Sequence, residues 1–321
     1  MRYTQLMILV TLAAFALSST AAVVVLGLAW PRLTSGLARV LPAARARLIL
    51  LLRLAPTLVG GCLSVVTLIA FLRYEPRSTA ERPGFVLLAA AALGAGLLLA
   101  GFWRVALRGW RTFRFLQAVQ RTAAPLTLPG VGLPAWQLDT LCPLVAIAGV
   151  WRPRFLIARR VVEQIPGDEL LVIVRHELAH VRQHDNVARL LLTGMPDVLA
   201  LAERWLGIGR TWSAAAEEAA DDLATGDDPE ARVCLASALV RVAKMAARQP
   251  ASLPLLAFHD GDSIERRVGR LLGAAAPGAP APLASMGYVT IALLAGTVPL
   301  LGSNAFLLGL HHAIENLVNA L

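Results

Sequence analysis

Hydrophobic positions along this chain fall into four long runs. These runs cover residues 6–30, 54–72, 85–102 and 286–308, and each holds between 18 and 25 residues. An α-helix of about 20 apolar residues crosses the roughly 30 Å hydrocarbon core of a bilayer. The pattern therefore predicts four transmembrane helices, with a more polar segment between the third and the fourth.

The first run also has some features of a signal peptide. Small residues at positions 18–22 would suit a cleavage site, but the apolar run continues through Val23 to Leu26 and only Arg2 precedes it. A signal peptide has a shorter apolar region and a more positive start. We therefore expect an uncleaved membrane anchor.

Composition and charge support a multi-pass membrane protein. The chain is 57% hydrophobic and 16% charged, and its mean hydropathy is +0.63. Its net charge of +9 comes almost entirely from arginine, with Lys244 the single lysine. The arginines gather in residues 32–53 and 104–121, and such flanks face the cytoplasm. We therefore expect the lipid bilayer, and not nucleic acid, to be the partner of this positive charge.

This orientation places both termini outside the cell and the polar segment in the cytoplasm. We expect residues 1–111 to form a membrane region with three spans and residues 112–284 to form a cytoplasmic domain. Residues 285–321 would then hold the fourth span and a short external tail.

The polar segment mixes strand and helix patterns. Residues 145–148 and 155–158 are short apolar runs on either side of a turn, which predicts a hairpin. Residues 166–169, Pro-Gly-Asp-Glu, open a helix, because acidic residues in a first turn complement the helix dipole. Residues 186–207 predict a core helix interrupted by a glycine and a proline. The expected fold class is a multi-pass α-helical membrane protein with an inserted, helix-rich α+β domain.

The helix that residues 166–169 open carries the sequence His176-Glu177-Leu178-Ala179-His180. Residues four apart lie one turn above each other on a helix, so both histidines can bind one metal ion. Two imidazoles suit zinc, which keeps an open position for water and lowers its pKa to about 7. Glu177 is then placed to act as the general base in peptide hydrolysis.

A third ligand is expected from an acidic segment about forty residues downstream. Glu217 would complete the metal site, and Asp221, one turn later, would orient a ligating histidine through a hydrogen bond. The pair Glu218 and Asp222 has the same spacing and is the alternative.

Other classes of zinc protease fit this motif less well. A metzincin has a glycine and a third histidine where this chain has Gln183 and Asn186. Intramembrane zinc proteases place the motif in an apolar span, whereas here charged residues flank it within the same helix. The motif therefore belongs to a water-accessible domain.

Polar residues outside the motif carry weaker signals. His184 lies four residues after the second motif histidine, but three helical histidines splay too far for one tetrahedral ion, so we expect a solvated residue. His259 is a candidate hydrogen-bond donor to the oxyanion of a transition state. Arg266, Arg267 and Arg270 are expected to contact lipid phosphates or helix ends.

The order of these features resembles the BlaR/MecR-type membrane metallopeptidases, which are gluzincins. The resemblance covers most of the chain. It rests on three spans, the hairpin with Trp151-Arg152-Pro153, the motif followed by Asp185-Asn186, the acidic segment 217–221 and a fourth span.

This resemblance implies a zinc peptidase domain that faces the cytoplasm from a bacterial plasma membrane. By motif position, His176, His180 and Glu217 would hold one zinc ion per chain, and Glu177 would be the general base. The antibiotic-sensing members carry a penicillin-binding sensor domain after the fourth span. Here about a dozen residues follow it, without a Ser-x-x-Lys motif, so we expect a short form that does not sense β-lactams.

The expected function is that of a membrane-anchored zinc endopeptidase that cleaves a protein or peptide, for example a transcriptional repressor in regulated proteolysis. Peptidases of the HtpX and CAAX-prenyl-protease types share the H-E-x-x-H and E-x-x-x-D elements, so quality-control proteolysis is one alternative. The other alternative is a membrane signalling or scaffold protein with a structural zinc site. Glu177 favours an enzyme, because a structural site needs no general base and usually closes with four protein ligands.

Overall fold

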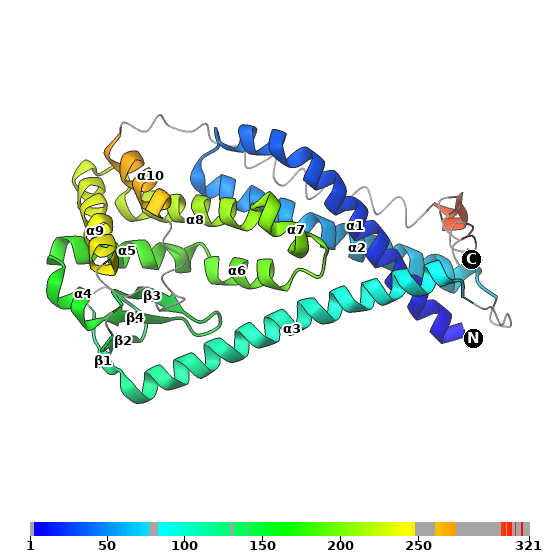
Figure 1. The fold of residues 1–321 in the computed structure, drawn as a ribbon, viewed down its shortest axis with the longest axis horizontal. Helices are drawn as coiled ribbons and strands as arrows, with labels where there is room; N and C mark the ends of the chain where they lie inside the picture. The colour runs from blue at the N-terminus through cyan, green and yellow to red at the C-terminus, as the bar shows by residue number, and fades with distance from the viewer. Residues whose placement is uncertain are drawn as a thin grey trace.

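The computed structural model describes residues 3–76, 83–128, 131–140, 142–247 and 261–273, with a few more between 303 and 316. Long helices dominate one end of the molecule, and shorter helices with a small sheet form the other (Figure 1). This arrangement confirms a helix-rich domain attached to membrane-type helices.

Among the described residues, three helices are long and apolar enough to cross a membrane. They are α1 (Tyr3–Leu37), α2 (Pro42–Tyr74) and α3 (Phe85–Thr122), and each contains one of the predicted spans. The fourth predicted span, residues 286–308, lies almost entirely outside the described residues.

The three helices are longer than a bilayer requires. The 38 residues of α3 correspond to about 57 Å at 1.5 Å per residue, against a hydrocarbon core of roughly 30 Å. α3 continues from the membrane end of the molecule to the sheet (Figure 1). The ends of the long helices therefore form part of the domain.

The domain contains seven further helices within the described residues. They are α4 (Arg159–Gln164), α5 (Gly167–Arg182), α6 (Asp185–Gly194), α7 (Leu199–Leu206), α8 (Ile208–Thr225), α9 (Pro229–Ala247) and α10 (Gly261–Leu272). The predicted start of α5 is confirmed. The predicted core helix 186–207 is two helices, α6 and α7, which separate at the expected glycine and proline.

A small mixed sheet lies beside α5. Its strands are β1 (Ala124–Leu126), β2 (Ala135–Leu138), β3 (Val145–Ala148) and β4 (Arg154–Ala158), in the order β1-β2-β4-β3. β3 and β4 pair antiparallel, with Ala146 opposite Leu156, which confirms the hairpin. β4 is central and buried, whereas β3 is an edge strand.

The turn of this hairpin requires a glycine. Gly149 has φ +99°, and a Cβ atom there would lie 2.9 Å from the carbonyl oxygen of Arg152. L-residues rarely adopt such a backbone conformation. The glycine thereby fixes where β3 ends.

Close packing joins the long helices to the domain. Trp30 of α1, Ile49 of α2 and Trp212 of α8 share one buried apolar cluster. Trp30 also donates a hydrogen bond of 2.9 Å to the carbonyl oxygen of Leu206. On α3, Gly101 admits the backbone of α6 so closely that a Cβ atom would lie 2.5 Å from the carbonyl oxygen of Gly194.

A buried ion pair reinforces this junction. Arg53 of α2 lies 2.7 Å from Asp197, and both side chains are almost fully buried. Thr57 donates a second hydrogen bond to the same carboxylate oxygen, and the other oxygen accepts the backbone N–H of Leu199. The Asp197 carboxylate therefore connects α2 to the segment between α6 and α7.

Replacing Asp197 with alanine leaves the Arg53 guanidinium buried and unpaired. We expect Asp197→Ala to lower the free energy of unfolding by about 3–5 kcal/mol. Urea denaturation of the purified protein in detergent micelles measures this loss.

Two controls accompany this measurement. The double variant Arg53→Met, Asp197→Leu removes both charges and should be clearly more stable than Asp197→Ala. Glu163→Ala breaks the exposed pair with Arg159 and should leave stability unchanged. Equal stability of Asp197→Ala and the unmodified protein would contradict the role assigned to this pair.

Candidate metal centre

Helix α5 presents two histidines on one face. His176 and His180 lie one turn apart, and their rings meet edge to face with centroids 4.8 Å apart. Val172, Ile173 and Val174 are buried in the same helix. Packing of these apolar residues fixes the rotation of α5 and hence the direction of its two imidazoles.

Helix α8 brings a carboxylate to the histidines. Glu217 Oε2 lies 3.4 Å from His176 Nε2, and Glu217 Oε1 lies 3.6 Å from His180 Nε2. Small buried residues of α8, among them Ala216 and Ala220, allow close packing at this point. One ligand atom from each of the three side chains lies within 4.8 Å of the other two.

These spacings fit a tetrahedral zinc ion. Two ligands bonded to zinc at about 2.0–2.1 Å are separated by roughly 3.3–3.4 Å at tetrahedral angles. The two contacts between histidine and Glu217 are close to that value. A set of two imidazoles and one carboxylate also leaves one position of such an ion open.

The second nitrogen of each histidine faces a different carboxylate. His176 Nδ1 lies 3.0 Å from Asp221, and His180 Nδ1 lies 2.6 Å from Asp185. Such contacts hold the proton on Nδ1 and direct Nε2 toward a metal. The spacing after Glu217 predicts this role for Asp221, whereas no sequence pattern predicts it for Asp185, although Asp185 lies only five residues after His180.

The alternative acidic pair on α8 points elsewhere. Glu218 pairs with Arg45 of α2 and lies 3.5 Å from Arg266. Asp222 lies 2.8 Å from Arg270. The geometry therefore favours Glu217 and Asp221 over Glu218 and Asp222.

Glu177 lies beside the three donors and is half-buried. Burial raises the pKa of its carboxyl group, and the charges of His180 and His176 oppose the rise. Burial opposes protonation of His180 as well, but the hydrogen bond to Asp185 and the nearby carboxylate of Glu217 prevail and raise its pKa to about 10. Among the described residues, no side chain donates a hydrogen bond to Glu177, so its carboxylate is available to a substrate or a water molecule.

Residues 139–266 match the family model described as BlaR1 peptidase M56. The matched residues are less than half of the chain, and they indicate similarity to the M56 peptidases. The match contains both histidines, Glu177, Glu217 and Asp221, and it confirms the resemblance to the BlaR/MecR-type family. No curated protein and no solved structure matches the chain.

An arginine just beyond the M56 match completes the centre. Arg267 of α10 makes two hydrogen bonds to Asp221, of 2.9 and 2.6 Å, and lies 3.1 Å from Glu217. Burial disfavours the charged form of Asp221, but the bonds to His176 and Arg267 lower its pKa to about 2. The prediction that Arg267 contacts lipid or a helix end is wrong, because this side chain is buried against Asp221, whereas the same prediction for Arg266 and Arg270, which also pair with carboxylates of α8, stays a prediction.

Two other histidines take no part in the described centre. α5 ends at Arg182, and His184 adopts a left-handed conformation with φ 59° in the turn before α6. The expectation that it shares a helix face with His180 is therefore wrong, whereas its predicted exposure is confirmed. The candidate donor His259 lies outside the described residues.

The edge strand β3 is hydrogen-bonded to the first turn of α6. Ala158 donates a hydrogen bond to the carbonyl of Leu144, so the alternation of an antiparallel pair directs the carbonyl of Ile147 away from β4. The amide of Asn186 donates to the carbonyls of Ile147 and Gly149, at 3.1 and 3.0 Å. Asp185 and Asn186 thus connect both His180 and the edge of β3 to the first turn of α6.

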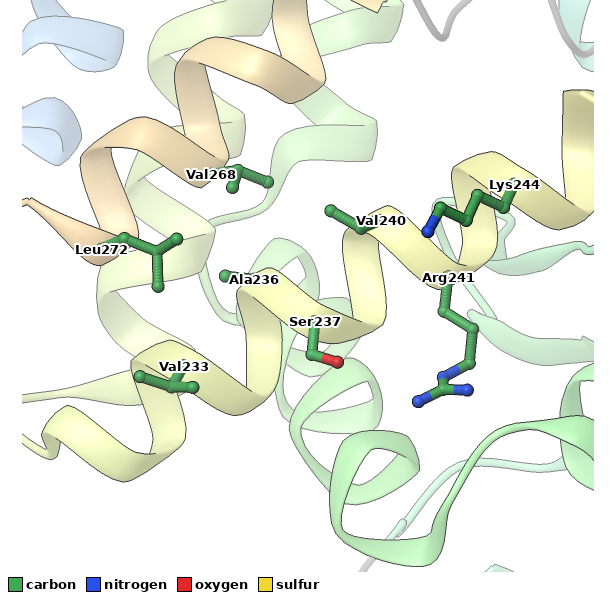
Figure 2. A pocket seen from close by; sticks show the side chains of 8 residues that line it. All are labelled: Val233, Ala236, Ser237, Val240, Arg241, Lys244, Val268 and Leu272. Carbon is green, nitrogen blue, oxygen red and sulfur yellow. The ribbon is translucent and has the colours of Figure 1, made fainter.

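An apolar groove between α9 and α10 is distinct from the metal centre (Figure 2). Its described lining residues include Val240, Val268 and Leu272, and none of those described is a histidine or a carboxylate. Two residues on its rim, Ser237 and Arg241, hydrogen-bond to the buried Glu169 at the start of α5. This part of α9 therefore anchors the histidine helix and contributes no ligand.

The contact between Asp221 and His176 predicts an effect on metal affinity. Asp221→Asn keeps the size of the side chain but removes the charge that holds the imidazole and Arg267. We expect the affinity for a divalent metal to fall about 10- to 100-fold. Competition with a chromophoric chelator measures this fall.

Asp222→Asn is the matched control, since Asp222 is on the same helix with a half-exposed side chain, and Arg270 is its ion-pair partner among the described residues. It should bind metal like the unmodified protein. Equal affinities of the two variants would contradict the assignment of Asp221.

Proposed function

We propose that this protein is a membrane-anchored zinc endopeptidase. The observation that carries the proposal is the group of His176, His180 and Glu217, with the free carboxylate of Glu177 beside it. The M56 match supports peptidase chemistry for this group.

His176, His180 and Glu217 would hold the zinc ion. Bound zinc supplies Lewis-acid chemistry, because it lowers the pKa of water to about 7 and polarises a carbonyl group. Glu177 accepts a proton from the attacking water and delivers it to the nitrogen of the departing amine. Burial raises the pKa of this carboxyl group, which favours acceptance of the proton from water.

The open edge of β3 suits an extended substrate. A peptide that adds to a sheet edge gains main-chain hydrogen bonds without a need for one particular sequence. The outward carbonyl of Ile147 already accepts a hydrogen bond from Asn186. The backbone around Val145 is therefore the part of the edge left for a substrate strand. A protein segment in extended conformation is therefore the substrate class that this site accepts.

The arginine-rich ends of the long helices favour a domain that faces the bacterial cytoplasm. The substrate would then be a cytoplasmic or membrane-associated protein, such as a transcriptional repressor in regulated proteolysis. Quality-control proteolysis of the HtpX or CAAX-protease type needs the same chemistry and differs in substrate. A structural zinc site in a scaffold protein is less favoured, since the group found among the described residues offers three ligands rather than four.

Glu177→Gln tests the proposal directly. The amide cannot accept a proton but has the same shape, so we expect cleavage to fall at least 10²-fold while zinc content stays at one ion per chain. Self-cleavage and cleavage of casein by the detergent-solubilised protein measure activity, and atomic absorption measures zinc.

Glu163→Gln on exposed α4 is the control, and it should cleave like the unmodified protein. A protein that binds zinc but cleaves nothing would support the scaffold alternative. Undiminished cleavage by Glu177→Gln would refute Glu177 as the base.

A further inference from the structure

Arg189 of α6 lies at the exposed side of the metal centre. Its Nη2 atom is 3.4 Å from Glu217 Oε1, the oxygen that also faces His180. The side chain of Arg189 is 37% exposed, whereas Arg267, which contacts the other oxygen of Glu217, is 7% exposed. Of these two guanidinium groups, only that of Arg189 is accessible to a bound peptide.

The helix that carries Arg189 is fixed relative to the centre. Asp185, in the first turn of α6, holds His180, and Arg189 lies four residues later on the same face. Farther along, Thr193 donates to the carbonyl of Arg189 and accepts a hydrogen bond from Arg108 of α3. The guanidinium therefore extends from a helix that is fixed at both ends.

Arg189 is also close to the proposed base. Glu177 is three residues before His180 on α5, so the two side chains are neighbours on the helix surface. Arg189 contacts the oxygen of Glu217 that faces His180, and it therefore lies where negative charge would develop on a substrate during hydrolysis.

Hydrolysis of a peptide needs a hydrogen-bond donor that stabilises this negative charge. As the water oxygen bonds to the carbonyl carbon, its proton passes to Glu177 and the C=O electron pair moves onto the carbonyl oxygen. The C–N bond then breaks, and the proton passes from Glu177 to the nitrogen. A donor fixed beside the carbonyl oxygen stabilises this transition state.

The described part of the domain offers few other donors of this kind, and the candidate His259 lies outside it. Residues 112–273 contain no tyrosine. Among the described histidines of this range, two face Glu217 and His184 is exposed in the turn before α6. Arginine is protonated throughout and presents several N–H groups in one plane, which suits an anionic oxygen.

We infer that Arg189 is a catalytic residue that donates hydrogen bonds to the oxyanion of the scissile peptide. This inference rests on the proposed function and extends it to a residue outside the zinc motif. Arg189 keeps its proton throughout the reaction and needs no co-reactant.

Arg189→Ala should lower kcat about 10²- to 10³-fold, with little change in KM and with zinc retained. Arg189→Lys keeps the charge but not the planar set of donors, so it should recover part of the loss. Arg182→Ala is the control, because it removes an equal charge from an exposed position at the end of α5. It should retain full activity.

A second readout does not depend on turnover. Cobalt-substituted protein titrated with methylphosphonate reports binding of a tetrahedral oxyanion through the visible spectrum of the metal. We expect Arg189→Ala to weaken this binding about tenfold or more, and Arg182→Ala to leave it unchanged.

Three outcomes would overturn the inference. They are unchanged kcat in Arg189→Ala, unchanged affinity for methylphosphonate, and a loss of activity that is fully explained by loss of zinc. If the unmodified protein binds cobalt but cleaves no peptide, the proposed function fails, and the titration still decides whether Arg189 contacts the oxyanion.

Discussion

Charge compensation on one turn of α8 is the constraint on which this structure depends. Glu217, Glu218, Asp221 and Asp222 occur within six residues, and Asp221 is completely buried. Buried carboxylates destabilise a fold unless cations and hydrogen bonds surround them. Here the cations come from α2, α6 and α10, so these three helices must assemble around α8 before the turn is stable.

This constraint sets the orientation of the metal donors. Glu218 pairs with Arg45 of α2, and Arg267 of α10 holds Asp221. Among the described residues, Glu217 then faces the histidines of α5, the exposed Arg189 and the buried Arg267. The orientation of this candidate metal ligand therefore depends on its own contacts and on those of its neighbours.

Local patterns in the sequence were sufficient for part of this centre. The spacing of His176 and His180 requires only one helical turn, and the apolar runs identified three membrane-type helices. Local sequence patterns could not decide between the two acidic pairs of α8. Both pairs have the same spacing, and their cationic partners lie up to 173 residues away. His184 was misplaced because nothing in the periodicity showed that α5 ends at Arg182. The parallel pairing of β2 with β4 likewise depends on tertiary contacts.

The position of Arg267 along the chain has a consequence for biosynthesis. The ribosome delivers the histidine helix first, then α8, and then α10, whose arginine follows Asp221 by 46 residues. Until α10 is made, Asp221 lacks the cation that stabilises its charge in the interior. The contact that compensates the charge of Asp221 can therefore form only after both α5 and α8 have been synthesised.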